Sequence, residues 1–242
     1  MRKILLVASV LCFISVSSCK KSDSTASYKC TACTTTPDAK AAYDNSSKGV
    51  YKGTVVGSTG TIKFNIGNND STITATMVID GTTVTLTASV AWVSGSAYVS
   101  PFTGTMGGSA VSITFSVGSD GSNPLVVTAN IPGHPGAMLN VTKETSTNLI
   151  MCFEGTYQDN SSSGDKGTLN LFLSEALKAW KVTSKSTVDT SSHSVISGTF
   201  SNNVLSYSDG SGGSITGTLS GDQITGTYVG KNNGTWTVKR TL

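Results

Sequence analysis

Hydrophobic and polar side chains alternate with a period of two from about residue 49 to the end of the chain. Ile62, Phe64 and Ile66, for example, alternate with threonine, lysine and asparagine. Successive side chains of a strand point to opposite faces, so the pattern predicts antiparallel strands with one buried face and one exposed face. Turn sequences rich in glycine, asparagine and serine separate the runs, and eight candidate strands fit into the first half.

The second half of this β-region repeats the first. The matching pairs of segments are 49–51 with 155–157, 60–64 with 167–171, 102–106 with 196–200, and 141–145 with 237–241. Similarity at a near-constant spacing is what duplication of one unit leaves behind. We therefore predict an all-β fold of two tandem up-and-down meanders, over 49–147 and 148–242, each of about eight short strands.

An eight-stranded sheet exposes two edges, and closure into a barrel removes them. We predict two small barrels, with one continuous sheet as the alternative. Strands that contain Gly-Thr followed by an aromatic residue resemble those of small lipocalin-like and avidin-like barrels; these strands include residues 155, 198, 226 and 234. The resemblance implies an interior that holds a side-chain core or one small ligand. The residues expected to fill the first interior are Ile62, Phe64, Ile73, Met77, Leu86 and Ile113. The candidates to face a ligand are Trp92, Trp180, Trp236, Tyr157 and Tyr228.

Two segments depart from the alternating pattern. Segment 36–43 predicts a short helix, because Pro37 suits the first helical position and Asp38 is favourable at the positive end of the helix dipole. Segment 174–180 combines a capping serine with good helix formers and predicts one or two helical turns. Trp180 could then close one barrel end, although a plain connection between strands fits this segment as well.

Residues 1–18 have the features of an export signal: two basic residues, an apolar run and small residues before Cys19. The apolar run is too short to cross a bilayer. A signal that ends at a cysteine resembles the lipobox of bacterial lipoproteins, and Cys-Lys-Lys resembles the start of many Bacteroidota lipoproteins. The resemblance implies that Cys19 is lipidated and that 19–48 is a polar tether. An ordinary secretory signal is the alternative.

Three further cysteines follow the predicted lipidation site. Cys30 and Cys33 form a CxxC pair, but no βαβ unit surrounds it and no second pair is present to complete a zinc site. In an oxidising compartment we expect a Cys30–Cys33 disulfide, with Cys152 as a small apolar residue on its strand. A bridge from either tether cysteine to Cys152 is the competing arrangement.

Charged residues make up only 13% of the chain, with a formal net charge of +3. The absence of a basic stripe with interleaved aromatic residues argues against nucleic acid as a partner. No common catalytic or phosphate-binding motif occurs, and His134 and His193 both fall in turns. Loops 159–165 and 208–214 carry oxygen ligands that calcium could use, but turn chemistry explains the same residues, so we predict no metal or cofactor.

These features favour a non-catalytic lipoprotein, exported and anchored in the cell envelope at the outer membrane. Its partner would be a glycan, a protein or a small apolar molecule, and a barrel cavity of about 300 Å³ or more would favour the small molecule. The alternative is an exported hydrolase or hydrolase inhibitor with carboxylates on its loops. That alternative predicts two inward carboxylates beside His134 or His193.

Overall fold

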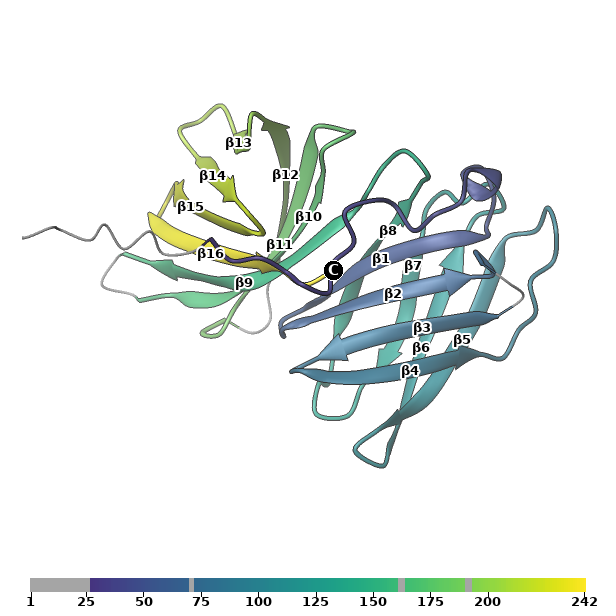
Figure 1. The fold of residues 1–242 in the computed structure, drawn as a ribbon. Helices are drawn as coiled ribbons and strands as arrows, with labels where there is room; N and C mark the ends of the chain where they lie inside the picture. Colours follow the sequence, from purple (N-terminus) through teal and green to yellow (C-terminus); the bar gives the residue numbers. More distant parts are fainter. Residues whose placement is uncertain (1–26, 70–71, 161–163, 190–192) are drawn as a thin grey trace, which may run out of the picture.

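The computed structural model describes residues 27–69, 72–160, 164–189 and 193–242. They form two eight-stranded antiparallel units that lie side by side and follow one another in the chain (Figure 1). The predicted all-β fold of two tandem meanders is therefore confirmed. The predicted signal sequence and Cys19 lie outside the described residues.

The first unit is a nearly closed barrel. Its strands are β1 (Gly49–Val56), β2 (Gly60–Ile66), β3 (Ile73–Ile79), β4 (Thr82–Ala88), β5 (Tyr98–Met106), β6 (Ser109–Val117), β7 (Leu125–Asn130) and β8 (Met138–Glu144). The spatial order is β7-β6-β5-β4-β3-β2-β1-β8. The last strand, β8, returns to pair with β1, while β7 and β8 approach each other with no ladder between them in the described residues.

The second unit is a closed barrel. Its strands are β9 (Met151–Asp159), β10 (Lys166–Ser174), β11 (Ala179–Ser186), β12 (His193–Ser201), β13 (Val204–Ser208), β14 (Ser214–Ser220), β15 (Gln223–Val229) and β16 (Gly234–Arg240). The last strand, β16, pairs with both β15 and β9. The two units therefore share one topology and differ by the single ladder that closes the second.

A packed side-chain core fills the first barrel. Ile62, Phe64 and Met77 are fully buried in it. The ring of Phe64 stacks on Phe115 with centroids 4.4 Å apart, and it meets Phe102 edge to face at 5.0 Å. Burying a side chain of this size contributes about 1.5–3 kcal/mol, so this inward face is the main source of stability of the first unit.

The helix predicted over 174–180 is wrong. The strands β10 and β11 pair as far as Ser174 and Ala179, which leaves four residues to connect them. Those residues form a turn in which the Ser174 hydroxyl accepts the backbone N–H of Leu177 at 3.1 Å, and Lys178 takes a φ of +50°. The capping role expected of Ser174 survives, but strand pairing overrides the helix propensity of the residues that follow.

The helix predicted over 36–43 is reduced to a single 3₁₀ turn, η1 (Ala41–Tyr43). Asp38 does not stand at a helix N-terminus. Its carboxylate binds Lys63 Nζ at 2.8 Å, and its backbone N–H donates to Glu144 at 2.7 Å. Contacts with the barrel, rather than local propensity, decide the conformation here.

The segment before β1 is docked on both barrels, as its path in Figure 1 shows. Its first described part covers one end of the second barrel. There the Tyr28 carbonyl accepts Asp222 N–H at 2.9 Å, Cys30 N–H donates to the Asp222 carboxylate at 2.9 Å, and the Tyr28 hydroxyl donates to the Arg240 carbonyl at 3.0 Å. Arg240 also donates to the carbonyl of Thr34. The tether is thus part of the fold from Ser27 onward.

The docked segment then passes over a buried ion pair on the outer face of β1. Lys52 Nζ lies 2.6 Å from Glu144, and both side chains are fully buried. Glu144 also accepts the backbone N–H groups of Asp38, at 2.7 Å, and Ile150, at 3.0 Å. One carboxylate therefore links the tether, the first barrel and the connection to the second.

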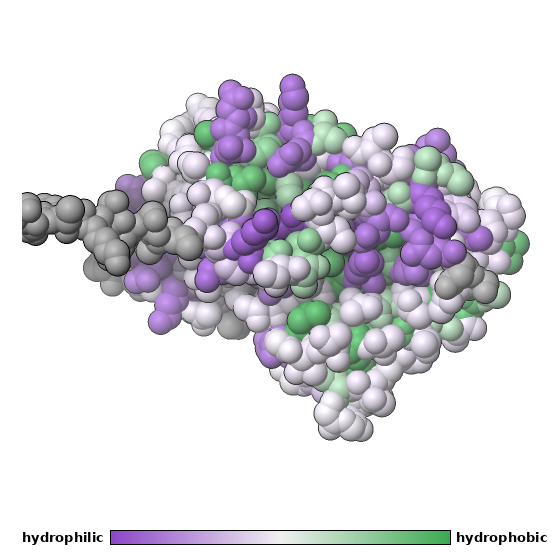
Figure 2. All heavy atoms as spheres, viewed as in Figure 1, coloured by the Kyte–Doolittle hydropathy of each residue, from purple (hydrophilic) through white to green (hydrophobic). Residues whose placement is uncertain are grey.

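The two barrels contact each other through the outer faces of β1, β9 and β10. The Asn170 side chain donates to the carbonyls of Val55 and Ser58, while Cys152 and Phe172 are buried beside it in a small apolar cluster. The surface in Figure 2 is otherwise mostly pale, because the outward positions of the strands are largely serine and threonine.

Candidate functional site

A cavity of about 340 Å³ opens at one end of the second barrel. It is lined by inward residues of the eight strands and of their connecting loops. The apolar and aromatic lining residues are Tyr157, Leu169, Leu171, Trp180, Val182, Ile196, Tyr207, Ile215, Tyr228, Val229 and Trp236. The opening lies at the Asp159 end of β9 and the Gly234 end of β16, which pair with each other. The docked segment covers the opposite end, beside Arg240, so the barrel has one closed and one open end.

Two tryptophans form the floor of this cavity, and each ring lies over glycine. A Cβ on Gly198 would lie 2.6 Å from the ring of Trp180. A Cβ on Gly217 or Gly226 would lie 2.5 Å from the ring of Trp236. Such distances are not allowed between real atoms, so only glycine leaves room for the indoles at the waist of the barrel. This close approach is the physical reason for the recurrent glycines inside the strands.

Two tyrosines continue the aromatic wall above the tryptophans. A Cβ on Gly167 would lie 2.7 Å from the ring of Tyr157, and Gly234 stands in the same relation to Tyr228. The two rings meet edge to face with centroids 6.2 Å apart. All four predicted ligand-facing residues of the second repeat therefore line one cavity, each in a place that a glycine keeps open.

Carboxylates stand at the rim of the cavity. The sequence Tyr-x-Asp occurs at the ends of two strands: Asp159 is the last residue of β9, and Asp209 directly follows β13. Each aspartate lies two positions beyond an inward tyrosine, Tyr157 or Tyr207, and both aspartates line the cavity. Asp165 joins them from the start of β10. Tyr207 was not among the predicted ligand-facing residues, and the aspartates were considered only as calcium ligands in loops 159–165 and 208–214, although the repeated Tyr-x-Asp at the ends of two strands is a signal that could have identified the rim.

The rim carboxylates interact with the tyrosines below them. Asp165 accepts the hydroxyl of Tyr157 at 3.2 Å and the hydroxyl of Ser186 at 2.6 Å. Burial raises the pKa of Tyr157. Burial, reinforced by the negative charge of Asp159, raises the pKa of Tyr228 to about 12. The upper wall of the cavity is therefore a site of negative electrostatic potential.

The two loops considered for calcium, 159–165 and 208–214, both contribute to this rim. Asp209 accepts the backbone N–H groups of Ser211 at 2.7 Å and Gly213 at 2.8 Å, and these hydrogen bonds lower its pKa. This is the turn chemistry that competed with calcium in the sequence analysis. Within the described ranges, no group of three or more His, Cys, Asp or Glu side chains is arranged to hold a metal ion.

The fifth predicted ligand-facing residue, Trp92, lies elsewhere. Its indole N–H donates to the Ser47 hydroxyl at 2.8 Å, and Lys48 Nζ lies 4.3 Å from the ring centroid. Trp92 packs against the core of the first barrel beside the start of β1. It thus contributes to closing that barrel and does not line the cavity of the second.

Neither histidine lines the cavity. His134 lies 3.2 Å from Asp80 on the first barrel, and His193 is exposed at the start of β12. Glu154 is on the outer face of β9, where Thr241 donates to it at 2.8 Å and burial raises its pKa. The inward carboxylates of the rim are thus separate from the two histidines and from Glu154.

The structure has a disulfide between Cys30 and Cys33, with Cα atoms 5.4 Å apart. Cys152 is a free, fully buried cysteine between the barrels, and burial raises its pKa to about 12. Its thiol is therefore neutral and shielded.

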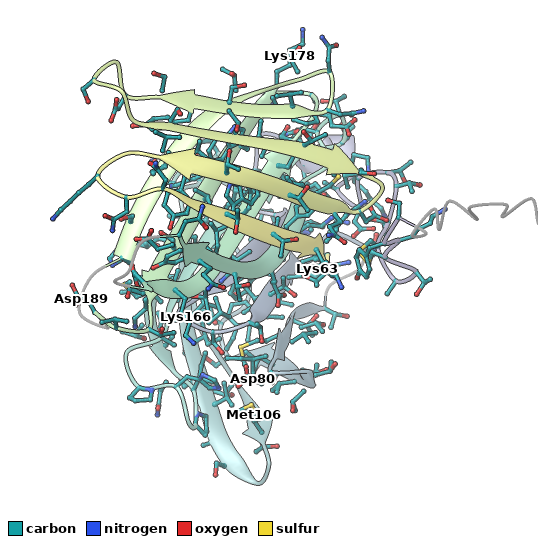
Figure 3. All side chains as sticks on the ribbon, turned by 90° about the vertical axis from the view of Figure 1, so that its left-hand side faces the viewer. Lys63, Asp80, Met106, Lys166, Lys178 and Asp189 are labelled. Atoms are coloured by element: carbon teal, nitrogen blue, oxygen red, sulfur yellow. A yellow bond between two sulfur atoms is a disulfide. The ribbon has the colours of Figure 1, made fainter. Side chains whose placement is uncertain are left out.

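Figure 3 shows Lys166 and Lys178 toward the two ends of the second barrel, the cavity end and the turn after β10 respectively.

Other depressions are larger but less enclosed by aromatic side chains. One of about 430 Å³ lies between the barrels beside Leu125, Leu139 and Phe172, and one of about 520 Å³ runs over outward threonines of β9, β15 and β16.

Within the described part of the chain, no helix has the length and apolar character needed to cross a membrane. No family model, curated protein or solved structure matches the chain.

Proposed function

We propose that this protein is a lipid-anchored envelope protein whose second barrel binds a small molecule, without catalysing a reaction on it. The cavity of about 340 Å³ carries the proposal. Concave sites of this size, walled by apolar and aromatic side chains with a few polar groups, are typical of small-molecule binding. The described lining holds carboxylates and hydroxyls but no histidine, lysine or cysteine to activate them, which supports binding rather than proton transfer or nucleophilic attack.

The position of the docked segment supports an orientation for this site. Cys19 precedes Ser27 by eight residues, and eight residues span at most about 28 Å when fully extended. The first described residues lie on the closed end of the second barrel, where the Ser27 hydroxyl donates to the Ser220 carbonyl at 2.7 Å. A lipid on Cys19 would therefore hold the closed end near the membrane and leave the opening directed away from it.

Titration with the neutral fluorescent probe N-phenyl-1-naphthylamine tests the binding site. We expect saturable enhancement of probe fluorescence by the purified protein, with a Kd on the order of 10 μM. Ile196→Trp, which adds an indole inside the cavity, should weaken binding by about tenfold or more, because the ring occupies the space that the probe needs. The cavity is not the site if this variant, folded by circular dichroism, binds the probe as well as the wild type.

A matched control lies one residue away. Val195→Trp adds the same side chain to the same strand, but Val195 points outward and is 47% exposed. We expect it to leave the Kd within about twofold of wild type, as surface substitutions usually do. If Ile196→Trp fails to fold, Ile215→Phe adds less volume to the cavity wall two strands away, on β14, and tests the same point.

Metabolic labelling with palmitate tests the anchor. We expect the wild-type protein, expressed in a bacterial host, to incorporate label and Cys19→Ser to lose essentially all of it. The double variant Cys30→Ser/Cys33→Ser removes two other cysteines of the segment and should retain the label. Unchanged labelling of Cys19→Ser contradicts the anchor and leaves the binding site to be judged on its own test.

A further inference from the structure

The charge on the wall of the cavity has one sign. Three aspartates, Asp159, Asp165 and Asp209, line the opening, and the described lining holds no lysine, arginine or histidine. Asp209 stays ionised because two backbone N–H groups stabilise its carboxylate. Lys166 and Lys231 are neighbours of lining residues in the chain but do not line the cavity themselves, so an anion that enters would meet three like charges on the lining, whereas a cation would find counter-ions there.

Ring surfaces dominate the space below the rim because the polar atoms of the largest rings are already paired. The indole N–H of Trp180 donates to the Thr199 carbonyl at 2.9 Å, and that of Trp236 donates to the Thr227 carbonyl at 3.3 Å. The hydroxyl of Tyr157 donates a hydrogen bond to Asp165 at the rim. Aromatic faces attract cations through the ring quadrupole, most strongly for tryptophan and tyrosine.

The order of the tiers gives the ligand a direction. Trp180 lies near the closed end of the barrel, at the start of β11, whereas Tyr157 precedes Asp159 by two positions at the open end of β9 and pairs with Trp236. From the closed end outward, the inward side chains therefore change from aromatic rings to carboxylates. A molecule with an apolar body and a charged head matches this gradient when its body points to the floor.

We propose that the second barrel selects an amphipathic organic cation, a primary to quaternary ammonium compound with an apolar body, and holds its head between the rim aspartates and the tyrosine rings. This inference rests on the proposed function and adds the charge of the ligand to it. It requires no reaction: the cation binds and leaves unchanged.

Two ligands of one shape separate charge from size. Benzyltrimethylammonium is the cation, and 2,2-dimethylpropylbenzene, in which carbon replaces the nitrogen, is its neutral isostere. Displacement of bound N-phenyl-1-naphthylamine gives both affinities for the full mature chain. We expect the cation to bind about tenfold tighter than the isostere or better, and this advantage to shrink as sodium chloride is raised from 20 mM to 500 mM.

Single substitutions of the rim aspartates should weaken binding of the cation but leave binding of the neutral isostere nearly unchanged. Asp209→Asn and Asp159→Asn are each expected to weaken benzyltrimethylammonium by about three- to tenfold and to leave the isostere within about twofold. Glu175→Gln is the matched control, because it removes the same charge from an exposed residue in the turn at the other end of the barrel. Asp209, on the surface loop, keeps the test available if the buried Asp159 proves necessary for folding.

The outcomes separate the two proposals. Equal or tighter binding of the isostere, or a loss of cation affinity in Glu175→Gln as large as in Asp209→Asn, overturns the selection for cations. Binding of the neutral probe would still support a small-molecule site in either case. If neither the probe nor the cation binds, both the cation selection and the proposed function are wrong.

Discussion

Trp236→Ala should lower the free energy of unfolding of the second barrel by about 3–5 kcal/mol, the cost of removing a large aromatic side chain from a packed interior. Trp236 is only 4% exposed and is part of the barrel core. Its neighbours cannot fill the space, because the residues that face it, Gly217 and Gly226, have no side chains to move. Equilibrium unfolding in urea measures the loss.

A double-mutant cycle with Gly217→Ala tests whether the glycine exists to accommodate the indole. The added Cβ would lie 2.5 Å from two ring atoms of Trp236 and 3.1 Å from Ile224, with no backbone atom among its three nearest neighbours. In the wild type we expect overpacking to cost about 1–3 kcal/mol. In the Trp236→Ala background the same methyl enters empty space and should be neutral or stabilising.

The coupling free energy between Gly217→Ala and Trp236→Ala decides whether the glycine accommodates the indole. A value of about 1–3 kcal/mol is expected for residues in direct contact. Gly226→Ala is unsuitable for this cycle, because its Cβ would also collide with the carbonyl of Thr216, whatever residue occupies position 236. Additive effects of Gly217→Ala and Trp236→Ala would contradict the proposed role of this glycine.

The strands could be predicted from the sequence because each one carries its own evidence. A strand with one buried face must alternate, so Ile62, Phe64 and Met77 identify their strands and their inward direction without knowledge of any partner. The two tandem units follow from the recurrence of these local patterns. Closure does not, because the ladder between the last two strands of a unit depends on the twist and tilt of all eight.

The register of the repeat could be predicted only approximately. The sequence similarity aligns Gly49 with Gly155, whereas the ladders make Gly53 the equivalent of Gly155: Gly53 pairs with Ile62, and Gly155 pairs with Leu169. The displacement of four residues arises because Gly-aromatic patterns recur within a strand as well as between units. Hydrogen-bond register, unlike composition, is a property of two strands at once.

Part of the candidate site could be predicted, because the alternation that identifies the strands also identifies which aromatic residues point inward. Aromatic residues on alternating strands identify inward rings, and four of the five suggested positions line the cavity. Trp92 does not, since it belongs to a loop whose path no periodicity reports. The rim aspartates lie in loops that read as turns, and only the closed barrel brings the two Tyr-x-Asp strands to one opening.

Lys52→Met should lower the free energy of unfolding by about 3–5 kcal/mol, because it leaves the buried carboxylate of Glu144 without its cation. Both partners are fully buried and 2.6 Å apart. Glu144 would keep the backbone N–H groups of Asp38 and Ile150, but two neutral donors do not replace a charge. The same change should expose the docked segment, which hydrogen exchange at Asp38 reports.

A double variant without either charge distinguishes the destabilisation caused by an unpaired buried carboxylate from the stability that the ion pair itself contributes. Lys52→Met/Glu144→Gln leaves no buried charge, and a glutamine oxygen can still accept a backbone N–H, so the double variant should be more stable than Lys52→Met alone. Urea unfolding of the two variants under identical conditions gives the difference. A double variant that is less stable than the single would mean that the ion pair itself, and not the avoidance of an unpaired charge, holds the segment.

Lys63→Met is the matched control, since both lysines approach the same carboxylate of Asp38, at 3.9 Å from Lys52 and 2.8 Å from Lys63. The Lys63 side chain is 35% exposed, so water replaces its ion pair and the expected loss is about 1 kcal/mol or less. The shorter contact to Asp38 is thus expected to matter less than the buried one to Glu144. If Lys52→Met cost no more than Lys63→Met, Glu144 would not be the link that joins the docked segment to both barrels.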